Sequence, residues 1–254
     1  MIEVRNIAKS FGGLMAVAGC SCHIRQGSIT GLIGPNGAGK TTLFNIIAGF
    51  EKPDAGRILF GGEDVTGVAP HRLFHKGLVR TFQIPHEFGG MTVLENLMLV
   101  PPGQHGERLL YPLFCRGRVR HQEQEIRRKA EETLAFLNID HLKHELAGNL
   151  SGGQKKLLEL GRTIMTDARA VLLDEPGAGV NRTLLGKLAD DIRRLNRERG
   201  YTFCIIEHDM GLIMELCDPV IVMAEGKVLA EGTMEEIRAN DRVKEAYLGE
   251  GGRA

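Results

Sequence analysis

The sequence predicts an α/β fold in which a mostly parallel sheet is accompanied by an antiparallel β layer and an inserted helical subdomain. The parallel sheet is indicated by short apolar runs, which are typical of strands buried on both faces. These runs cover residues 170–173, 203–206 and 220–223. Helical patterns separate them, most clearly at residues 182–199, and this alternation predicts right-handed βαβ units.

The antiparallel layer is predicted near the N-terminus. Residues 2–27 are rich in β-forming side chains and contain turn signals at residues 11–13 and 26–27. Residues 57–60 have the character of another short strand. Closely spaced strands with turns between them favour antiparallel pairing, so we expect a β layer beside the parallel sheet.

The helical subdomain is indicated by a change in the sequence pattern after residue 85, where apolar runs typical of strands no longer occur. Residues 116–138 have the pattern of a charged amphipathic helix, whose arginines are interpreted as a solvated face. A further helix is predicted over residues 234–248. The expected organisation is a core with its β layer (1–84 and 155–232), a helical subdomain (85–154) and a C-terminal helical extension (233–254).

Composition limits the class of protein. The chain has 254 residues, 43% of them hydrophobic, which suits one large α/β domain. Lys plus Arg and Asp plus Glu both total 32, so the zero net charge argues against a nucleic-acid partner. No apolar run approaches the roughly 18 residues of a membrane span, and the N-terminus does not resemble a signal peptide. Five scattered cysteines favour a reducing cytosol over a disulfide framework.

The most informative segment is Gly34–Thr42, which fits G-x-x-x-x-G-K-[ST] between a strand predicted over residues 29–33 and a helix predicted over residues 43–48. Glycines let successive backbone N–H groups turn around a polyphosphate, and the helix N-terminus adds a favourable dipole. Lys40 can reach the β- and γ-phosphates, and the Thr41 hydroxyl can ligate Mg²⁺. The segment predicts a nucleoside-triphosphate site formed by Asn36, Gly37, Ala38, Gly39, Lys40, Thr41 and Thr42.

Two carboxylates follow the apolar run 170–173. Asp174 is expected to support Mg²⁺, directly or through water, and Glu175 to polarise the water that attacks the γ-phosphate. The carboxyl ends of parallel strands are where ligands of open α/β sheets bind. The alternative is an acidic loop that caps the next segment.

A second glycine-rich element, Leu150–Gln154, places Ser151 as a helix N-cap before a helical pattern. A capped, glycine-opened helix start is a second candidate anion site. Taken alone, it is better explained as an ordinary helix cap.

With these motifs in place, the chain resembles the nucleotide-binding subunits of ATP-binding cassette (ABC) transporters over nearly its whole length. The resemblance implies a P-loop NTPase (RecA-like) core, an ATPase activity and the cofactors ATP and Mg²⁺. It makes Gly34–Thr42 the Walker A motif and Leu150–Gln154 the family's signature. Two subunits would then pair head to tail, so that Ser151, Gly153 and Gln154 of one belong to the ATP site of the other.

Further roles are implied by the same resemblance. Gln83 matches the glutamine that senses Mg²⁺, and His208 matches the histidine that contacts the γ-phosphate. Phe11 matches the aromatic that stacks on adenine, with Val17 packing beside it; core packing is the alternative for Phe11. Asn181 stands in the D-loop where many members have aspartate, and the glycines at 177 and 179 are expected to loosen that loop.

Within the family, several strings resemble ATPases of branched-chain amino-acid uptake, among them residues 11–17, 91–97, 207–210 and 247–249. The resemblance implies a second ATPase subunit, identical or paralogous, membrane permease subunits, and a periplasmic solute-binding protein as an indirect partner. The chain would lie in the cytoplasm on the inner face of the membrane. Residues 84–90 match the segment that docks the permease; a plain surface loop is the alternative.

Other functions stay open at this point. Related ABC systems for urea or amides, aromatic acids or lipopolysaccharide share most of these strings. An ABC-type ATPase of DNA repair or of ribosomes is a second class, disfavoured by the charge balance and by the lack of a long coiled coil. A regulatory module that binds ATP without turnover is a third, disfavoured by Glu175 and His208.

Overall fold

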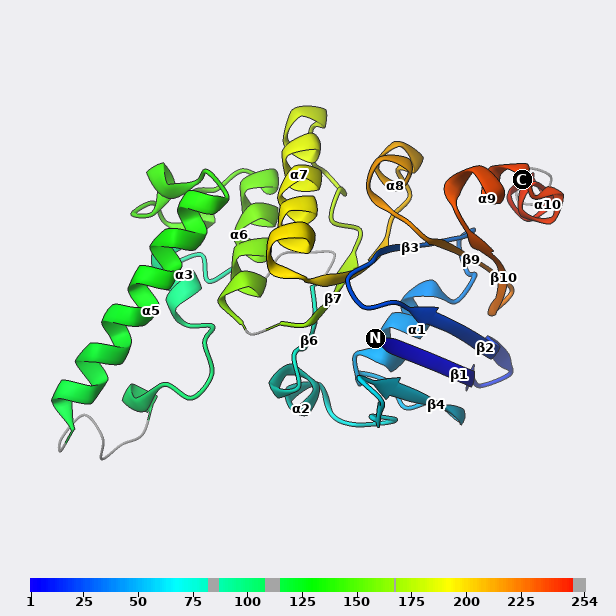
Figure 1. Ribbon diagram of the computed structural model, residues 1–254, viewed down its shortest axis with the longest axis horizontal. Coiled ribbons are helices and arrows are strands. Elements are labelled where there is room, and N and C mark those ends of the chain that lie inside the picture. The colour runs from blue at the N-terminus through cyan, green and yellow to red at the C-terminus, as the bar shows by residue number, and fades with distance from the viewer. Residues whose placement is uncertain (82–86, 108–114, 167, 249–254) are drawn as a thin grey trace. The chain divides into compact units, whose positions relative to one another are not determined.

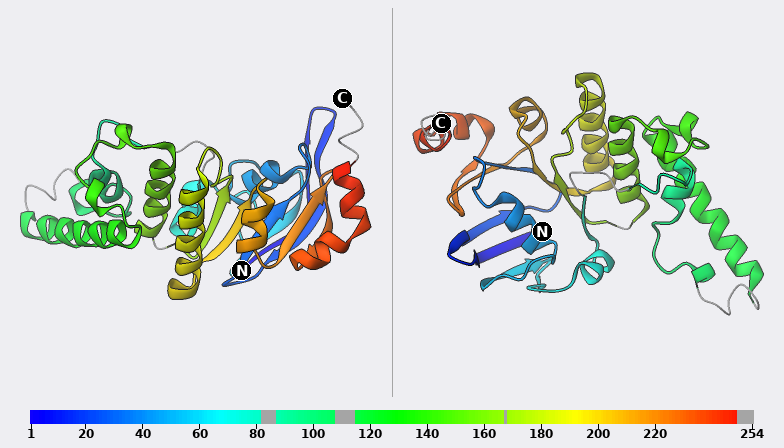
Figure 2. Two further views of the ribbon diagram at one scale, coloured as in Figure 1. Left: turned by 90° about the horizontal axis from the view of Figure 1, so that it is seen from above. Right: turned by 180° about the vertical axis from the view of Figure 1, so that it is seen from behind.

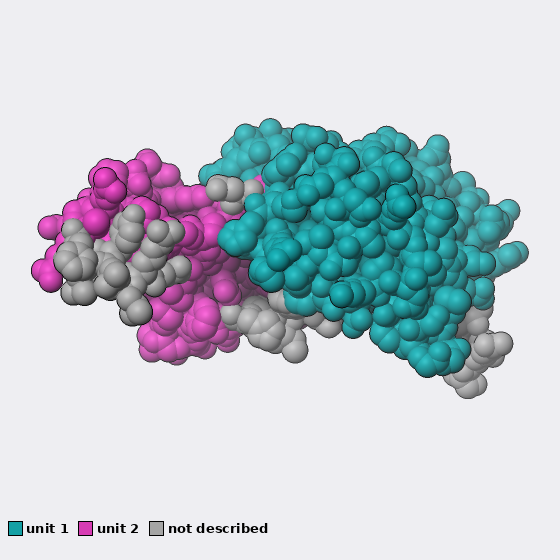
Figure 3. Space-filling model, turned by 90° about the horizontal axis from the view of Figure 1, so that it is seen from below, with its two compact units in different colours: residues 1–83, 169–178, 185–254 teal, residues 84–168, 179–184 magenta. Residues whose placement is uncertain are grey.

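The computed structural model describes residues 1–81, 87–107, 115–166 and 168–248. It divides into two compact units, shown in different colours in Figure 3. Unit 1 comprises residues 1–83, 169–178 and 185–254, and unit 2 comprises residues 84–168 and 179–184. Each unit is described by itself.

Unit 1 contains a six-stranded sheet with the strand order β10-β9-β3-β8-β7-β6 (Figure 1). All neighbours are parallel except β10, which pairs antiparallel with β9. Every residue of β3, β7 and β8 is buried, as expected for parallel strands covered on both faces. The strands are β3 (Ile29–Ile33), β6 (Leu78–Arg80), β7 (Ala170–Asp174), β8 (Thr202–Ile206), β9 (Val220–Ala224) and β10 (Lys227–Gly232).

The predicted antiparallel layer is confirmed as a second sheet of unit 1, with the order β2-β1-β4-β5. Its first two strands form a hairpin in which Phe11 pairs with Leu14 at the turn. The strands are β1 (Ile2–Phe11), β2 (Leu14–Ile24), β4 (Ala55–Phe60) and β5 (Glu63–Asp64). The sequence analysis does not predict β5, β6 and β10 as separate strands. These strands are short or lie at the edges of the sheets.

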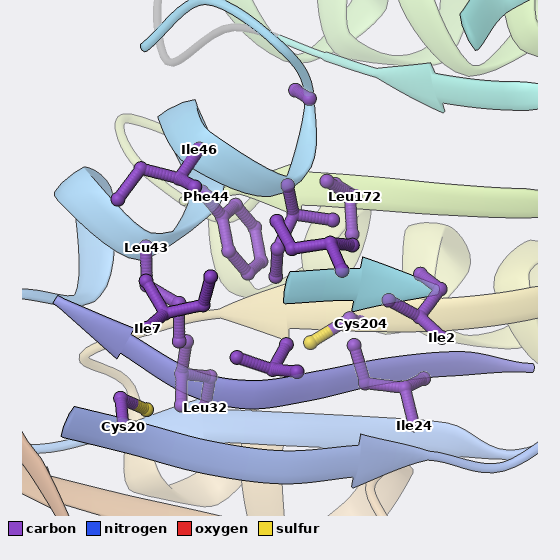
Figure 4. Packing of buried hydrophobic residues seen from close by; sticks show 14 of the residues in the cluster. Ile2, Ile7, Cys20, Ile24, Leu32, Leu43, Phe44, Ile46, Leu172 and Cys204 are labelled. Carbon is purple, nitrogen blue, oxygen red and sulfur yellow. The ribbon is translucent and has the colours of Figure 1, made fainter. Parts of the chain in front are cut away.

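The core of unit 1 joins both sheets through α1 (Lys40–Ile47). Leu43 and Phe44 of α1 are at most 1% exposed and belong to one cluster with Ile7 of β1 and Leu172 of β7 (Figure 4). A fully buried Leu or Phe side chain contributes about 1.5–3 kcal/mol of transfer free energy. Because α1 is the helix that follows the phosphate loop, this packing fixes the loop against the parallel sheet.

The remaining helices of unit 1 are α2 (Pro70–His75), α8 (Met210–Leu216), α9 (Met234–Ala239), α10 (Asp241–Leu248) and most of α7 (Arg182–Arg199). The prediction of one helix over residues 234–248 was wrong in its continuity. Asn240 leaves the helical conformation at φ −76° and ψ 116°, and its Oδ1 accepts from the Arg242 N–H. An Asn side chain that bonds to the backbone two residues on offers the chain an alternative to a continued helix.

Unit 2 is built around α3 (Val93–Met98), α5 (Arg116–Phe136) and α6 (Gly152–Met165), with short 3₁₀ turns at His105–Glu107, Asp140–Leu142 and Ala147–Asn149. The long predicted helix is α5, one continuous helix in both views of Figure 2. A Cβ atom at Gly161 of α6 would lie 3.1 Å from Leu137 and 3.2 Å from Leu97, so the glycine admits close helix packing. Unit 2 continues to residue 168 and includes α6, whereas the sequence analysis expects the helical subdomain to end at residue 154.

Among the residues that the structure describes, no helix is both long enough and apolar enough to span a bilayer.

Candidate functional site

The phosphate loop runs from the end of β3 to the start of α1, and two of its glycines are sterically required. Gly34 has φ +149° and Gly39 has φ +94°, a region that residues with side chains rarely adopt. A Cβ atom would lie 2.1 Å from the Met223 carbonyl oxygen at Gly34, and 2.3 Å from the Ala16 carbonyl oxygen at Gly39. The loop is therefore closely packed against neighbouring backbone, and its shape depends on these glycines.

The side chain of Lys40 lies within the phosphate loop and bonds to its backbone. Its residue is 6% exposed, and its Nζ donates to the carbonyl oxygens of Gly34 at 2.7 Å and Pro35 at 2.8 Å. The N-cap of α1 is Gly39, which offers no side-chain cap, so the first turn of the helix presents backbone N–H groups. A buried ammonium beside a helix N-terminus suits a polyphosphate. Thr41, in that first turn, is exposed.

The strand order places the catalytic candidates at one edge of the sheet. The strands β3, β8 and β7 are parallel neighbours, so the phosphate loop, His208 and Glu175 all follow carboxyl ends. His208 Nε2 lies 3.2 Å from Glu175 Oε1. Glu175 has φ +49°, a left-handed conformation uncommon for a glutamate, and its N–H bonds to the Ile206 carbonyl at 2.9 Å. The structure thus brings together two residues that are 33 positions apart in the chain.

Glu207 belongs to the candidate site, although the sequence analysis assigned it no role. It is 5% exposed, and its carboxylate accepts from the backbone N–H groups of Gly177 at 2.5 Å, His208 at 3.0 Å and Asp209 at 3.4 Å. The carboxylate therefore ties the loop after Glu175 to the segment that carries His208. The position of this glutamate, directly before His208, is the feature of the sequence that could have indicated its role.

The same contact corrects the expectation for Gly177. A Cβ atom there would lie 2.8 Å from Glu207 Oε1, so the glycine makes room for the carboxylate and holds the loop at this point. Gly179, at φ +73°, is in the left-handed region where glycine is favoured. Asn181 Oδ1 accepts from the Leu184 N–H at 3.0 Å, the bond of an N-cap for α7. Asn and Asp serve equally well as N-caps, so the amide at 181 keeps this local role.

Replacement of Glu207 by Gln is expected to lower the free energy of unfolding by about 1–3 kcal/mol and to reduce ATP turnover. The new NH₂ group would face backbone N–H donors, and a buried donor without an acceptor costs about that much. Urea unfolding and phosphate release measure the two effects. Glu123→Gln, an exposed glutamate of α5, is the matched control and should change the unfolding free energy by less than about 0.5 kcal/mol. If the Glu207 variant has the same free energy of unfolding as the wild-type protein, the role of this carboxylate is refuted.

The signature residues lie in unit 2, at the start of α6. Ser151 and Gln154 form a capping box: Ser151 N–H donates to Gln154 Oε1 at 2.8 Å, and Gln154 N–H donates to Ser151 Oγ at 3.4 Å. The Gln154 side chain, predicted to bind the cofactor, is thus engaged in the cap. A Cβ atom at Gly153 would lie 1.9 Å from Leu184 Cδ2, so a side chain at this position would displace Leu184. Ser151 is exposed at the helix start.

The two residues predicted at the adenine differ in exposure. Phe11 is 47% exposed, and Lys9 Nζ lies 5.2 Å from its ring centroid, within the range of a cation–π contact. Val17 is 0% exposed and belongs to the core cluster. Val17 therefore supports the hairpin from inside and offers no surface to a base. Gln83 lies outside the described residues.

Comparison with known proteins assigns the family. Residues 17–178 match the family model described as "ABC transporter", and residues 227–253 match one described as "Branched-chain amino acid ATP-binding cassette transporter". A solved structure described as a nucleotide-free ATP-binding cassette from an ABC transporter superposes with a TM-score of 0.83 at 40% identity, covering 97% of this chain and 98% of that one. The chain therefore belongs to the ABC transporter ATP-binding cassettes, and its α/β fold is the fold of that family.

Among its relatives within this family are proteins of one transport class. The chain is 44% identical to the probable branched-chain amino acid transport ATP-binding protein LivG of Archaeoglobus fulgidus, over 98% of this chain and 95% of that protein. It is 40% identical to the high-affinity branched-chain amino acid transport ATP-binding protein BraF of Pseudomonas aeruginosa, over 98% of each.

Proposed function

We propose that this chain is the ATP-hydrolysing subunit of an ABC importer for branched-chain amino acids. The observation that carries the proposal is the arrangement in unit 1 of a phosphate loop, a carboxylate and a histidine at the carboxyl ends of neighbouring parallel strands. The transport class is supported by the relatives at 37–44% identity and by the C-terminal match over residues 227–253.

The residues fit a magnesium–nucleotide complex. In this proposal the loop backbone and Lys40 hold the phosphates, and Thr41 and Asp174 hold Mg²⁺, which would neutralise charge on the phosphate oxygens. Glu175 orients the attacking water and accepts its proton. His208, whose Nε2 lies 3.2 Å from Glu175 Oε1 in the structure, contacts the γ-phosphate once nucleotide is bound. Phe11 provides the ring on which adenine stacks.

The site is completed by a second subunit, identical or paralogous. Ser151 and the helix start that it caps present N–H groups suited to a phosphate, while each subunit already has its own phosphate loop. A head-to-tail pair gives that second anion site a ligand, the ATP held by the partner. Closure of the pair on ATP and its reopening after hydrolysis would drive the permease.

The permease is expected to dock on the segment 84–90, of which residues 87–90 are described. In unit 2 residues 87–89 contact α6 and the turn that precedes it. Glu87 pairs with Lys155 at 2.5 Å, Arg162 lies 5.7 Å from the Phe88 ring centroid, and Gly148 N–H donates to the Gly89 carbonyl at 3.2 Å. Phe88 is 52% exposed, so it offers apolar surface to a membrane subunit.

The test is to isolate the native complex through a tag on this chain and to reconstitute it in liposomes with its solute-binding protein. We expect permease subunits to co-purify, and MgATP hydrolysis and uptake of leucine, isoleucine or valine to depend on one another. Uptake of urea, amides or aromatic acids instead would assign a different substrate class. Recovery of the chain on ribosomes or DNA, without membrane subunits, would refute the transport function.

A further inference from the structure

Arg80 is the last residue of the edge strand β6, and its side chain is almost entirely buried in unit 1. Its strand pairs in parallel with β7, with Arg80 opposite Leu172, and the next residue, Thr81, donates its N–H to the Leu172 carbonyl at 2.9 Å. The Arg80 side chain is 6% exposed. A buried guanidinium needs partners of opposite charge or with acceptor oxygens, and its contacts therefore indicate what it does.

The guanidinium joins two elements of the nucleotide site. Its Nη2 donates to Asp174 Oδ2 at 2.7 Å, and its Nη1 donates to Asn45 Oδ1 of α1. The planar fork of an arginine can hold two such acceptors in a fixed relation, which a lysine ammonium does not do. Asp174 is the carboxylate at the end of β7, and α1 is the helix that begins in the phosphate loop.

The position of Asn45 on α1 connects the contact between Arg80 and Asp174 to the start of the helix that carries Thr41. Asn45 follows Thr41 by four residues on α1, so the two side chains lie on the same face of the helix. Arg80 therefore contacts one proposed Mg²⁺ ligand, Asp174, directly, and reaches the other, Thr41, through the helix one turn away. Within the described part of the chain, Asp174 Oδ1 makes no side-chain hydrogen bond, so the contact with Arg80 leaves that oxygen for a metal or its water.

We propose that Arg80 is a positioning residue for the divalent cation: it sets the separation between the Asp174 carboxylate and the Thr41 hydroxyl by bridging β7 to α1. The proposal rests on the assignment of Mg²⁺ to Asp174 and Thr41 in the proposed function. Partners that orient metal ligands in this way typically contribute 10–100-fold to metal affinity.

The competing explanation is a buried ion pair that serves stability alone, since removal of one partner of such a pair costs about 3–5 kcal/mol. Two variants separate the explanations. Asn45→Ala keeps the pair between Arg80 and Asp174 but breaks the bridge to α1. Arg80→Lys keeps the positive charge but cannot hold both acceptors.

The experiment uses the full chain with ATP bound and Mn²⁺ as the probe of the cation site, with free Mn²⁺ measured by electron paramagnetic resonance. Both variants should raise the half-saturating Mn²⁺ concentration by about 10–100-fold. ATP affinity in EDTA, measured by calorimetry, should stay within about threefold of wild type, because the phosphate loop and Lys40 are unchanged. Arg57→Met, an exposed arginine of β4, is the control and should alter neither quantity.

Asp174→Asn distinguishes the two ways in which the proposal can fail. If this variant leaves Mn²⁺ affinity unchanged, the assignment of the metal to Asp174 is wrong, and the proposal for Arg80 falls with it. If Asp174→Asn weakens Mn²⁺ binding while Asn45→Ala and Arg80→Lys bind Mn²⁺ as wild type does, only the positioning role is overturned. Should Arg80→Lys fail to fold, Asn45→Ala decides the question alone.

Discussion

Replacement of Glu175 by Gln is expected to lower ATP turnover by about 10²–10⁴-fold, which corresponds to roughly 3–5 kcal/mol in the activation barrier. Glutamine keeps the size of the side chain and a polar group beside His208, whose Nε2 lies 3.2 Å from Glu175 Oε1 in the structure. It cannot accept a proton from water. The loss should therefore fall on the chemical step, and ATP binding should survive.

Phosphate release with MgATP measures this loss, calorimetry measures binding, and gel filtration with ATP measures pairing. Because ATP would bind without being hydrolysed, ATP-dependent dimers should accumulate. Glu225→Gln is a matched control, since Glu225 shares the left-handed backbone of Glu175 at φ +49° but lies in the turn between β9 and β10. Near-normal hydrolysis by the Glu175 variant would remove this carboxylate from the catalytic role.

Replacement of Lys40 by Met should weaken ATP binding by more than about 100-fold while the nucleotide-free subunit still folds. The Lys40 ammonium lies within the loop, 2.7 Å from the Gly34 oxygen and 2.8 Å from the Pro35 oxygen, where it can meet bound phosphates with little rearrangement. Charge-assisted hydrogen bonds contribute about 1.5–3 kcal/mol each, so the loss of contacts to two phosphates accounts for this factor. Methionine retains the apolar stem that packs in the buried position.

Calorimetric titration with ATP and thermal unfolding with and without ATP check this expectation. The variant should unfold close to the wild-type temperature without nucleotide and should gain no stability from ATP, because stabilisation by a ligand requires binding to the native state. Lys52→Met, an exposed lysine, serves as control and should bind ATP normally. Wild-type affinity in the Lys40 variant would place the triphosphate elsewhere on the molecule.

Elements specified by local pattern were predictable. The strand β3 coincides with the predicted run, and β7 and β8 each extend theirs by one residue, because uninterrupted apolar residues have no other stable environment than a covered sheet. The helix α7 has the predicted bounds, Arg182–Arg199, since its apolar residues recur at helical spacing. The break at Asn240 was missed because no Gly or Pro marks it, and the Asn240 side chain, which accepts from the Arg242 N–H, interrupts the helix.

In the candidate site, too, motifs of adjacent residues could be predicted from the sequence, whereas the orientation of single side chains could not. The loop Gly34–Thr42 and the two acids at the end of β7, Asp174 and Glu175, are recognisable because the chemistry of each is carried by adjacent residues. The assignment of Val17 to the base and of Gln154 to the cofactor required knowledge of where each side chain points. In the structure Val17 faces the core and Gln154 faces the N–H of Ser151.

The sequence by itself determined the class of chemistry, because a glycine-rich loop, its lysine and a strand-terminal carboxylate pair are contiguous strings whose spacing dictates their geometry. Only the tertiary structure decided how these strings are held together. Glu207 reaches Gly177 across 30 residues, and Arg80 reaches Asp174 across 94, through contacts that no local pattern encodes. The physical reason is that a buried charge finds its partners where the packing of strands and helices places them.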